Sequence, residues 1–206
     1  MPLSWKGMGR LSNKLYSVGQ FVCRTYFRLF YRIKVEGKEN IPSDGGILLC
    51  SNHIHLLDPP FVGAFLKRQT RFMAKAELFD APILKRLLPK LGAFPIRRGM
   101  SDRQALRTGL KLLKDSEMIG LFPEGTRSKT GKLGKGLTGV GFFALRSNAS
   151  VVPCAVIGTY KPFSTLKVVY GPPVDMESAR ENKISAEEAT EQIMSGIQRI
   201  LDENHH

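Results

Sequence analysis

The sequence of 206 residues has no apolar run close to the roughly 20 residues that a membrane-spanning helix needs. Its three cysteines are widely spaced and form no CxxC pair, which indicates reduced thiols rather than a disulfide framework. Cys50 and Cys154 stand in apolar runs and are expected to be buried in the core. Acidic residues are scarce, 18 against 31 basic ones, so the formal net charge is +13. That charge predicts an anionic partner, which can be nucleic acid, an acidic membrane surface or a phosphorylated substrate.

Runs of strand period and helix period alternate from residue 45 onward, which predicts a central sheet with helices on its faces. The helix after residue 57 is expected to use Asp58 as its N-cap, with Pro59 at its first position. The last helix opens with the capping-box pattern of Ser185 and Glu188, and the run 166–174 alternates like an edge strand. The expected strands are 45–52, 71–78, 93–99, 117–123, 150–160 and 166–174, and the expected helices are 58–69, 81–92, 102–114, 139–148 and 185–203.

An amphipathic helix is expected over residues 16–37, and it has two interpretations. Arg24, Arg28 and Arg32 follow one another at intervals of four residues, and bulky apolar side chains flank this basic face. The pattern is typical of a helix that lies in a membrane interface, but also of a helix that packs its aromatic residues on its own core. The chain is therefore divided into an N-terminal segment, 1–35, and an α/β domain, 36–206. The flanking side chains are Phe21, Phe27, Phe30, Tyr31 and Ile33.

The stretch NHIHLLDPP (52–60) places two histidines and an aspartate between an apolar run and two prolines. A dinuclear metal site would need further ligands, but Pro59 stands where a third histidine is required, and the other two histidines end the chain. A serine nucleophile is not expected either, because the sequence has no GxSxG elbow. Two main hypotheses remain open: Asp58 orients His53 as a general base, or His53 ends a strand and Asp58 caps a helix. A mononuclear metal site, completed by carboxylates from elsewhere in the chain, is a minor third alternative.

Arginines follow two further apolar runs, FPIRRG (94–99) and FPEGTRS (122–128). Because the carboxyl ends of parallel strands gather at one edge of a sheet, Arg97, Arg98 and Arg127 are expected near His53. Their guanidinium groups suit a phosphate, unless they are solvated surface residues, and Glu124 is expected to orient them as an ion-pair partner. The sequence GKGLTG (134–139) does not predict a dinucleotide site, because no acidic residue follows it before Asp175; we interpret it as part of a lysine-rich loop.

The motifs NHIHLLD, FPIRRG, FPEGTRS and VVPCAVIG, in this order, resemble the four blocks of the glycerolipid acyltransferase family, most specifically the 1-acyl-glycerol-3-phosphate acyltransferases. The resemblance covers roughly residues 36–175. It implies a central mixed sheet flanked by helices, as in glycerol-3-phosphate acyltransferase, and a membrane-associating N-terminal helical segment. It also implies acyl transfer from acyl-CoA or acyl carrier protein to the sn-2 hydroxyl of lysophosphatidate, which gives phosphatidate. The enzyme is then expected at the cytoplasmic face of the membrane, peripheral or monotopic on its phospholipid surface, without a cofactor or metal.

The resemblance also implies roles for individual residues. His53 is the general base, Asp58 holds its tautomer, and Lys75 supports the oxyanion. The strand with Pro153 would form a wall for the acyl chain. Residues implied to bind the acceptor phosphate are Arg98, Glu124, Gly125, Thr126 and Arg127.

Two positions depart from the family pattern. His55 stands where the family often has serine, and Arg97 where an acidic residue is frequent. Both leave the acceptor specificity open, and packing or capping is the expected role of His55. The alternative function is a non-catalytic basic protein that binds a membrane or nucleic acid. Nucleic acid is not the expected partner, because the sequence contains no motif known to bind it.

Overall fold

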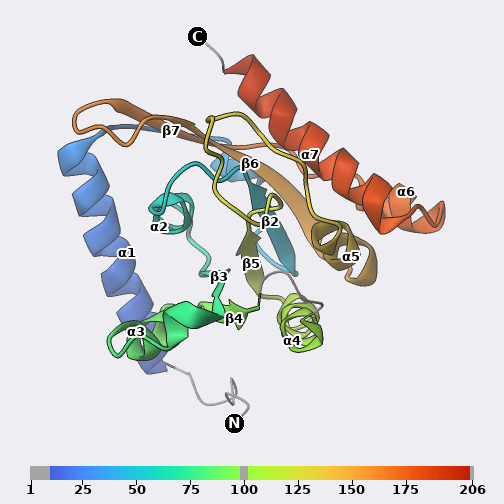
Figure 1. Cartoon of the computed structure of the whole chain (residues 1–206), viewed down its shortest axis with the longest axis horizontal. Helices are drawn as coiled ribbons and strands as arrows, with labels where there is room; N and C mark the ends of the chain where they lie inside the picture. The colour runs from blue at the N-terminus through green and yellow to red at the C-terminus, as the bar shows by residue number, and fades with distance from the viewer. Residues whose placement is uncertain (1–9, 98–101, 205–206) are drawn as a thin grey trace.

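A mixed sheet with the strand order β1-β7-β6-β2-β5-β3-β4 organises the chain in the computed structural model, which describes residues 10–97 and 102–204 (Figure 1). The five strands from β6 to β4 run parallel, whereas β7 is antiparallel to β6 and parallel to β1. The mixed sheet was implied by the family resemblance and is confirmed. The strands are β1 (Arg32–Glu36), β2 (Ile47–Ser51), β3 (Thr70–Lys75), β4 (Phe94–Ile96), β5 (Met118–Leu121), β6 (Ser150–Gly158) and β7 (Thr165–Tyr170).

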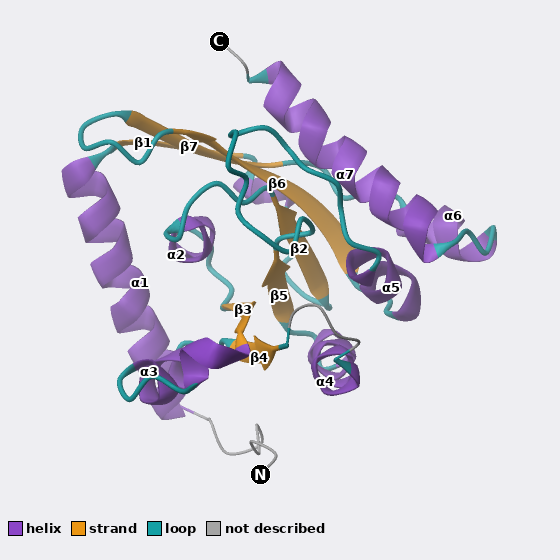
Figure 2. Cartoon of the chain, viewed as in Figure 1, coloured by secondary structure: helices purple, strands orange, loops and turns teal. Residues whose placement is uncertain are grey.

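Helices cover both faces of this sheet (Figure 2). The first two pack on one face, and α5 and α7 pack on the other. The predicted capping box at Ser185 is confirmed, because its hydroxyl accepts from the Glu188 amide while the Glu188 carboxylate accepts from the Ser185 amide. The helices are α1 (Arg10–Phe30), α2 (Asp58–Ala64), α3 (Leu84–Lys90), α4 (Arg103–Lys114), α5 (Gly139–Arg146), α6 (Met176–Glu181) and α7 (Ala186–Glu203), with 3₁₀ turns at Lys38–Asn40 and Ala76–Phe79.

The central strand β2 separates two hydrophobic cores. Leu48 and Cys50 point into the core beneath α5 and α7, whereas Ile47 and Leu49 point into the core beneath α1 and α2. Every residue of β2 is buried, which explains why its sequence is a continuous apolar run rather than an alternating one. A strand buried on both faces gives the loop that follows it a rigid attachment.

The prediction of one helix over residues 16–37 is wrong at its end. The helix stops at Phe30, and Arg32 begins β1, whose register with β7 is fixed by pairs such as Val35 with Val168. Residues 32–36 alternate polar and apolar side chains, and this period of two was hidden by the helical pattern before it. The predicted division of the chain between residues 35 and 36 remains a prediction; both residues lie in β1.

The predicted basic face of this helix is also wrong. Arg24 turns inward, where its Nε donates to the carbonyl of Ala64 at the end of α2, and Arg32 is not in the helix. Phe27 is fully buried, so one side of α1 packs on the hydrophobic core. Its outward side is instead apolar, with exposed side chains at Leu15, Val18, Phe21, Val22 and Leu29.

The expected edge strand is wrong as well, because β7 lies between β1 and β6. Leu166, Val168 and Tyr170 point into the core beneath α1 and α2, and the residues between them are less buried. The alternation therefore reports that one face of the strand is more buried than the other. It contains no information on whether a further strand pairs beside it.

Candidate functional site

The carboxyl edge of the parallel strands brings residues together that are far apart in the sequence. His53 follows β2, Phe122 and Glu124 follow β5, and Tyr160 follows β6. Asn52 helps to fix this arrangement, because its side chain pairs with both backbone groups of Val156 in β6: the amide of Val156 donates to Oδ1 at 2.7 Å, and Nδ2 donates to the carbonyl at 3.0 Å. Asn52 thus holds the start of the His53 loop on the sheet. Its place directly after an apolar run was the only signal of this role in the sequence.

His53 and Asp58 form a buried pair. The His53 Nδ1 atom lies 2.7 Å from Asp58 Oδ2, and the two residues are 7% and 0% exposed. The same oxygen accepts from the backbone amides of Ile54 and His55, both at 2.7 Å. Since a buried charge is costly unless several donors surround it, this carboxylate is held in place by the loop that contains the histidine.

The prediction that Asp58 caps the next helix is wrong. The N-cap of α2 is Leu57, and Asp58 occupies the first helical position with its carboxylate turned back towards residues 53–55. Pro59 therefore stands at the second position of the helix rather than the first. Of the two hypotheses for this stretch, the geometry favours a histidine oriented by a carboxylate over a strand end followed by a helix cap.

The ring of His53 is fixed by stacking on Phe122, with ring centres 4.0 Å apart and planes inclined by 18°. Phe122 in turn stacks on Phe72 of β3, at 5.9 Å. With Nδ1 beside the carboxylate, the second ring nitrogen, Nε2, has no hydrogen bond to the part of the chain that the structure describes. A neutral imidazole held in this way presents a lone pair that can accept a proton.

The FPEGTRS loop holds the backbone of His53 from both sides. The His53 amide donates to Glu124 Oε1 at 2.9 Å, and its carbonyl accepts from the Ser128 amide at 2.7 Å. The other Glu124 oxygen accepts from the Gly134 amide at 2.8 Å. Glu124 therefore does orient the site, but through backbone amides; among the described residues its carboxylate forms no ion pair with an arginine.

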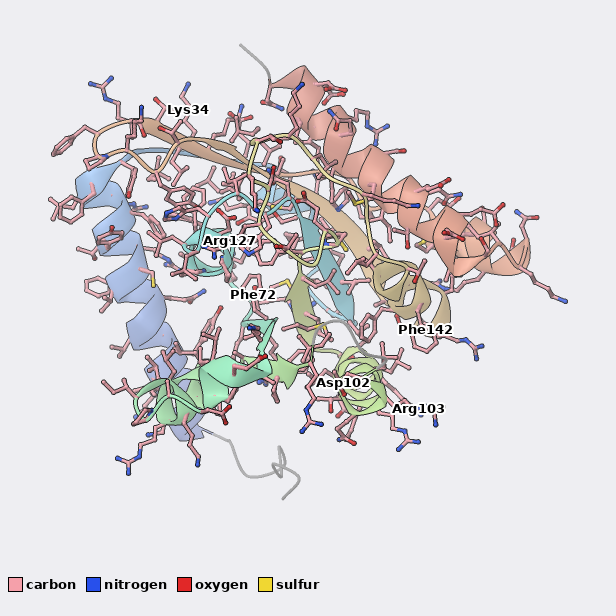
Figure 3. The ribbon with its side chains drawn as sticks, viewed as in Figure 1. Lys34, Phe72, Asp102, Arg103, Arg127 and Phe142 are labelled. Atoms are coloured by element: carbon pink, nitrogen blue, oxygen red, sulfur yellow. The ribbon has the colours of Figure 1, made fainter. Side chains whose placement is uncertain are left out.

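The residues predicted to bind phosphate differ in how far the structure describes them and in how exposed they are. Gly125 adopts a positive φ of 67°, and a Cβ there would lie 2.4 Å from Leu137, so the turn requires glycine. Thr126 and Arg127 are exposed in the loop that follows, and Figure 3 shows Arg127 in this loop. Arg98 lies outside the described residues. Lys75 lies at the end of β3, where its ammonium contacts Glu77 at 3.4 Å, and no contact between described residues links it to His53.

Tyr160 belongs to the same cluster, although nothing in the sequence pointed to it. Its hydroxyl donates to Asp58 Oδ1 at 2.7 Å, and its ring stacks on His55 at 4.1 Å. Burial, together with the nearby charge of Asp58, raises the pKa of the phenol far above its ordinary value, so Tyr160 stays protonated. The stacking and the His55 Nδ1 atom, which accepts from the Leu57 amide, agree with the packing role expected for His55.

A pocket of about 670 Å³ opens beside this cluster, between the ends of β4 and β5 and the starts of α4 and α5. Phe122 and Glu124 line it and also contact His53. Its polar rim includes Arg97 and Asp102; Figure 3 shows Asp102 at the start of α4 and Phe142 on α5. Besides Phe122, its apolar lining consists of Met73, Ile96, Leu106, Leu121, Pro123, Leu137, Val140, Phe142, Phe143 and Ala186.

The expected wall at Pro153 does not line this pocket. Pro153 lies under α7 instead, where a Cβ added at Gly196 would contact it at 3.3 Å. Cys50 and Cys154 are fully buried, and burial raises the pKa of both thiols, so they are protonated core residues, as predicted. Across residues 10–97 and 102–204, no three His, Cys, Asp or Glu side chains are grouped in a way that could hold a metal ion.

Comparisons with known proteins identify the family of the chain. The family model described as Acyltransferase matches residues 32–157. The chain is 30% identical over 184 residues to the 1-acyl-sn-glycerol-3-phosphate acyltransferase of Bacillus subtilis, which covers 83% of this chain and 90% of that protein. It is 35% identical over 139 residues to the chloroplastic 1-acyl-sn-glycerol-3-phosphate acyltransferase LPAT1 of Arabidopsis thaliana, covering 66% of this chain but only 39% of that longer relative.

The fold has a solved counterpart. The crystal structure of the 1-acyl-sn-glycerophosphate (LPA) acyltransferase PlsC from Thermotoga maritima superposes with a TM-score of 0.76 at 25% identity, and the match covers 100% of this chain and 85% of that one. The resemblance inferred from the four sequence motifs is thereby confirmed. This chain belongs to the acyltransferase family.

Proposed function

We propose that this protein is a 1-acylglycerol-3-phosphate O-acyltransferase. It transfers a fatty acyl group from acyl-CoA or acyl carrier protein to the sn-2 hydroxyl of lysophosphatidate and forms phosphatidate, a step of phospholipid biosynthesis. The observation that carries the proposal is the buried His53–Asp58 pair, which leaves Nε2 as the histidine nitrogen available for chemistry. Membership of the acyltransferase family and the names of the relatives support the choice of substrates.

The pair acts as a general base in this reaction. His53 Nε2 removes the proton of the acceptor hydroxyl while the oxygen attacks the thioester carbonyl, and Asp58 stabilises the imidazolium that forms. The tetrahedral intermediate then expels the thiolate, which takes the proton from the imidazolium. The acyl group passes directly to the acceptor, so no covalent acyl-enzyme is formed. Lys75 remains a proposal for support of the oxyanion.

The acceptor phosphate is bound on the exposed side of the FPEGTRS loop. Arg127 offers a guanidinium fork there, and Arg98 is proposed as its partner. Gly125 and Glu124 shape the turn that presents these groups, because Gly125 has a positive φ and Glu124 anchors the turn to the His53 amide. Thr126 adds a hydroxyl at the same exposed turn.

The acyl chain of the donor occupies the pocket beside Phe122. Its volume of about 670 Å³ and its mostly apolar lining suit a hydrocarbon chain. Phe122 connects the two parts of the site, because it contacts the His53 ring and also lines the pocket. A thioester carbonyl placed beside His53 would therefore direct its chain between α4 and α5.

The outward side of α1 lies on the phospholipid surface at the cytoplasmic face, as a peripheral or monotopic attachment. Phe21, Val22 and Leu29 are exposed there by 58% or more, and burying such side chains in lipid is favourable. The net charge of +13 adds attraction to anionic lipids. Among the described residues, no helix has the length and hydropathy of a membrane span.

The proposal is tested by adding lysophosphatidate and acyl-CoA, or acyl carrier protein carrying a fatty acid, to wild-type protein and to His53→Ala. The free thiol and the phosphatidate are both measured. We expect turnover by the wild type and a loss of at least about a hundredfold in the variant. Equal activity of the two proteins would refute the mechanism but not the substrate class. Absence of wild-type turnover with both donors would refute the substrate class.

A further inference from the structure

We infer that Tyr160 is a positioning residue of the reaction, whose hydroxyl holds Asp58 so that the carboxylate both orients His53 and keeps it a usable base at neutral pH. The inference rests on the proposed role of His53 as general base. It extends the pair of His53 and Asp58, which both follow β2, to a third side chain that follows β6.

The hydrogen bonds of Asp58 leave one place for such a residue. Oδ2 is already hydrogen-bonded to His53 Nδ1 and accepts from the amides of Ile54 and His55, each at 2.7 Å. Oδ1 receives the Tyr160 hydroxyl, also at 2.7 Å. Tyr160 is thus the side chain that fixes the rotation of the carboxylate about its last torsion, because it bonds the oxygen that the histidine loop does not reach.

The position of Tyr160 is itself well determined. Its ring stacks on His55 with the planes inclined by 20°, and it meets Phe61 and Tyr31 edge to face at 6.3 and 6.0 Å. The chain reaches this position through Gly158, whose φ is 110° and where a Cβ would lie 2.3 Å from the Thr165 carbonyl oxygen. The aromatic contacts therefore direct the hydroxyl at Asp58, and glycine permits the turn that brings it there.

The hydroxyl also affects the charge that His53 experiences. Because the phenol stays neutral, its hydrogen bond draws negative charge towards Oδ1 without adding a second ion. Without it, the charge concentrates on Oδ2 beside His53 and favours the protonated imidazole. A general base must be unprotonated, so the acid limb of the pH–rate profile would move to higher pH and activity at neutral pH would fall.

The other titratable groups around the pair do not produce the same effect. Cys154 of β6 and Tyr31 after α1 are neutral, because burial raises the pKa of each. Glu124 contacts the His53 amide, not its ring. His55 is half-buried and carries its own imidazole, so its titration must be resolved from that of His53.

The test is Tyr160→Phe, which removes the hydroxyl and keeps the ring stacked on His55. The matched control is Tyr170→Phe, which removes another 2.7 Å hydrogen bond from a buried tyrosine, donated there to the backbone carbonyl of Val62. For Tyr160→Phe we expect kcat to fall about tenfold with the KM for lysophosphatidate unchanged, and the acid limb to rise by about one pH unit. The control is expected to keep the wild-type pH profile.

A second measurement does not depend on turnover. The titration midpoint of the His53 ring, followed by NMR and assigned as the signal that is lost in His53→Ala, is expected to rise in Tyr160→Phe and not in Tyr170→Phe. The inference would be overturned if the His53 midpoint were unchanged in Tyr160→Phe, or if Tyr160→Phe kept the pH–rate profile of the wild type. If the midpoint rises while even the wild type fails to acylate lysophosphatidate, the inference holds and the proposed substrate is wrong.

Discussion

The two halves of the candidate site differ in how firmly the protein holds them. His53 and Asp58 are buried, and both carboxylate oxygens of Asp58 take part in hydrogen bonds of 2.7 Å. Arg127, only three residues beyond the buried Glu124, is exposed, and its guanidinium makes no hydrogen bond or ion pair to residues 10–97 or 102–204. One half is organised within the protein itself, whereas the other, in the function that we propose, would gain its order when the acceptor phosphate binds.

This difference matches the needs of the two tasks. A base works best when its geometry is set in advance, because reorganisation during the reaction costs rate. A phosphate-binding arginine at the surface keeps its hydration until the ligand replaces it, and its long side chain can adapt to a lipid headgroup. Substitutions in the buried half should therefore change kcat, and substitutions in the exposed half should change KM.

The largest effect is expected from Asp58→Asn. An asparagine presents an amide NH₂ to donors that need an acceptor, and it can favour the wrong tautomer of His53, so kcat should fall by about 10³ to 10⁴. Asp175→Asn is the matched control, because Asp175 is an exposed N-cap of α6. Steady-state kinetics with lysophosphatidate measure both. A variant that kept more than a tenth of the wild-type kcat would show that the buried half does not set the chemistry.

A smaller effect, on binding, is expected from Arg127→Ala. Loss of charge-assisted hydrogen bonds to the phosphate should raise the KM for lysophosphatidate about 30-fold and change kcat less than threefold. The KM of Arg127→Lys should lie between those of the wild type and Arg127→Ala, since lysine keeps the charge but lacks the forked guanidinium group. Arg103→Ala, which removes an exposed arginine of α4 (Figure 3), serves as the control. A loss confined to kcat would contradict the division between the halves.

The smallest effect is expected at the outward side of α1, tested by Val18→Glu with Val22→Glu. Two carboxylates on this exposed apolar surface should lower flotation with anionic phospholipid vesicles about fivefold, because they oppose both burial and electrostatic attraction. Gln192→Glu with Ser195→Glu makes the same change of charge on exposed positions of α7. Equal flotation of the two double variants would show that only net charge matters and that α1 has no special role.

The sequence predicted those parts of the site that depend on local pattern. The apolar run before His53 and the runs before Arg97 and Glu124 indicated strands that end at one edge, and β2, β4 and β5 do so. The start of β1 was missed because Arg32 continues the four-residue spacing of Arg24 and Arg28 in α1, although it is the first residue of the strand. The bond from Tyr160 to Asp58 joins residues 102 positions apart, and one sequence contains no periodicity that reports such a contact.

The two hydrogen bonds that hold the backbone of His53 limit how this enzyme can be recombined with its relatives. From one loop, Glu124 accepts from the His53 amide and Ser128 donates to the His53 carbonyl, and Gly134 completes the arrangement by donating to Glu124. A chimaera that exchanges the histidine loop alone would join a foreign backbone path to a native acceptor and donor. The smallest module that can be transplanted intact is therefore the pair of segments 52–58 and 122–134 together, despite the 63 residues between them.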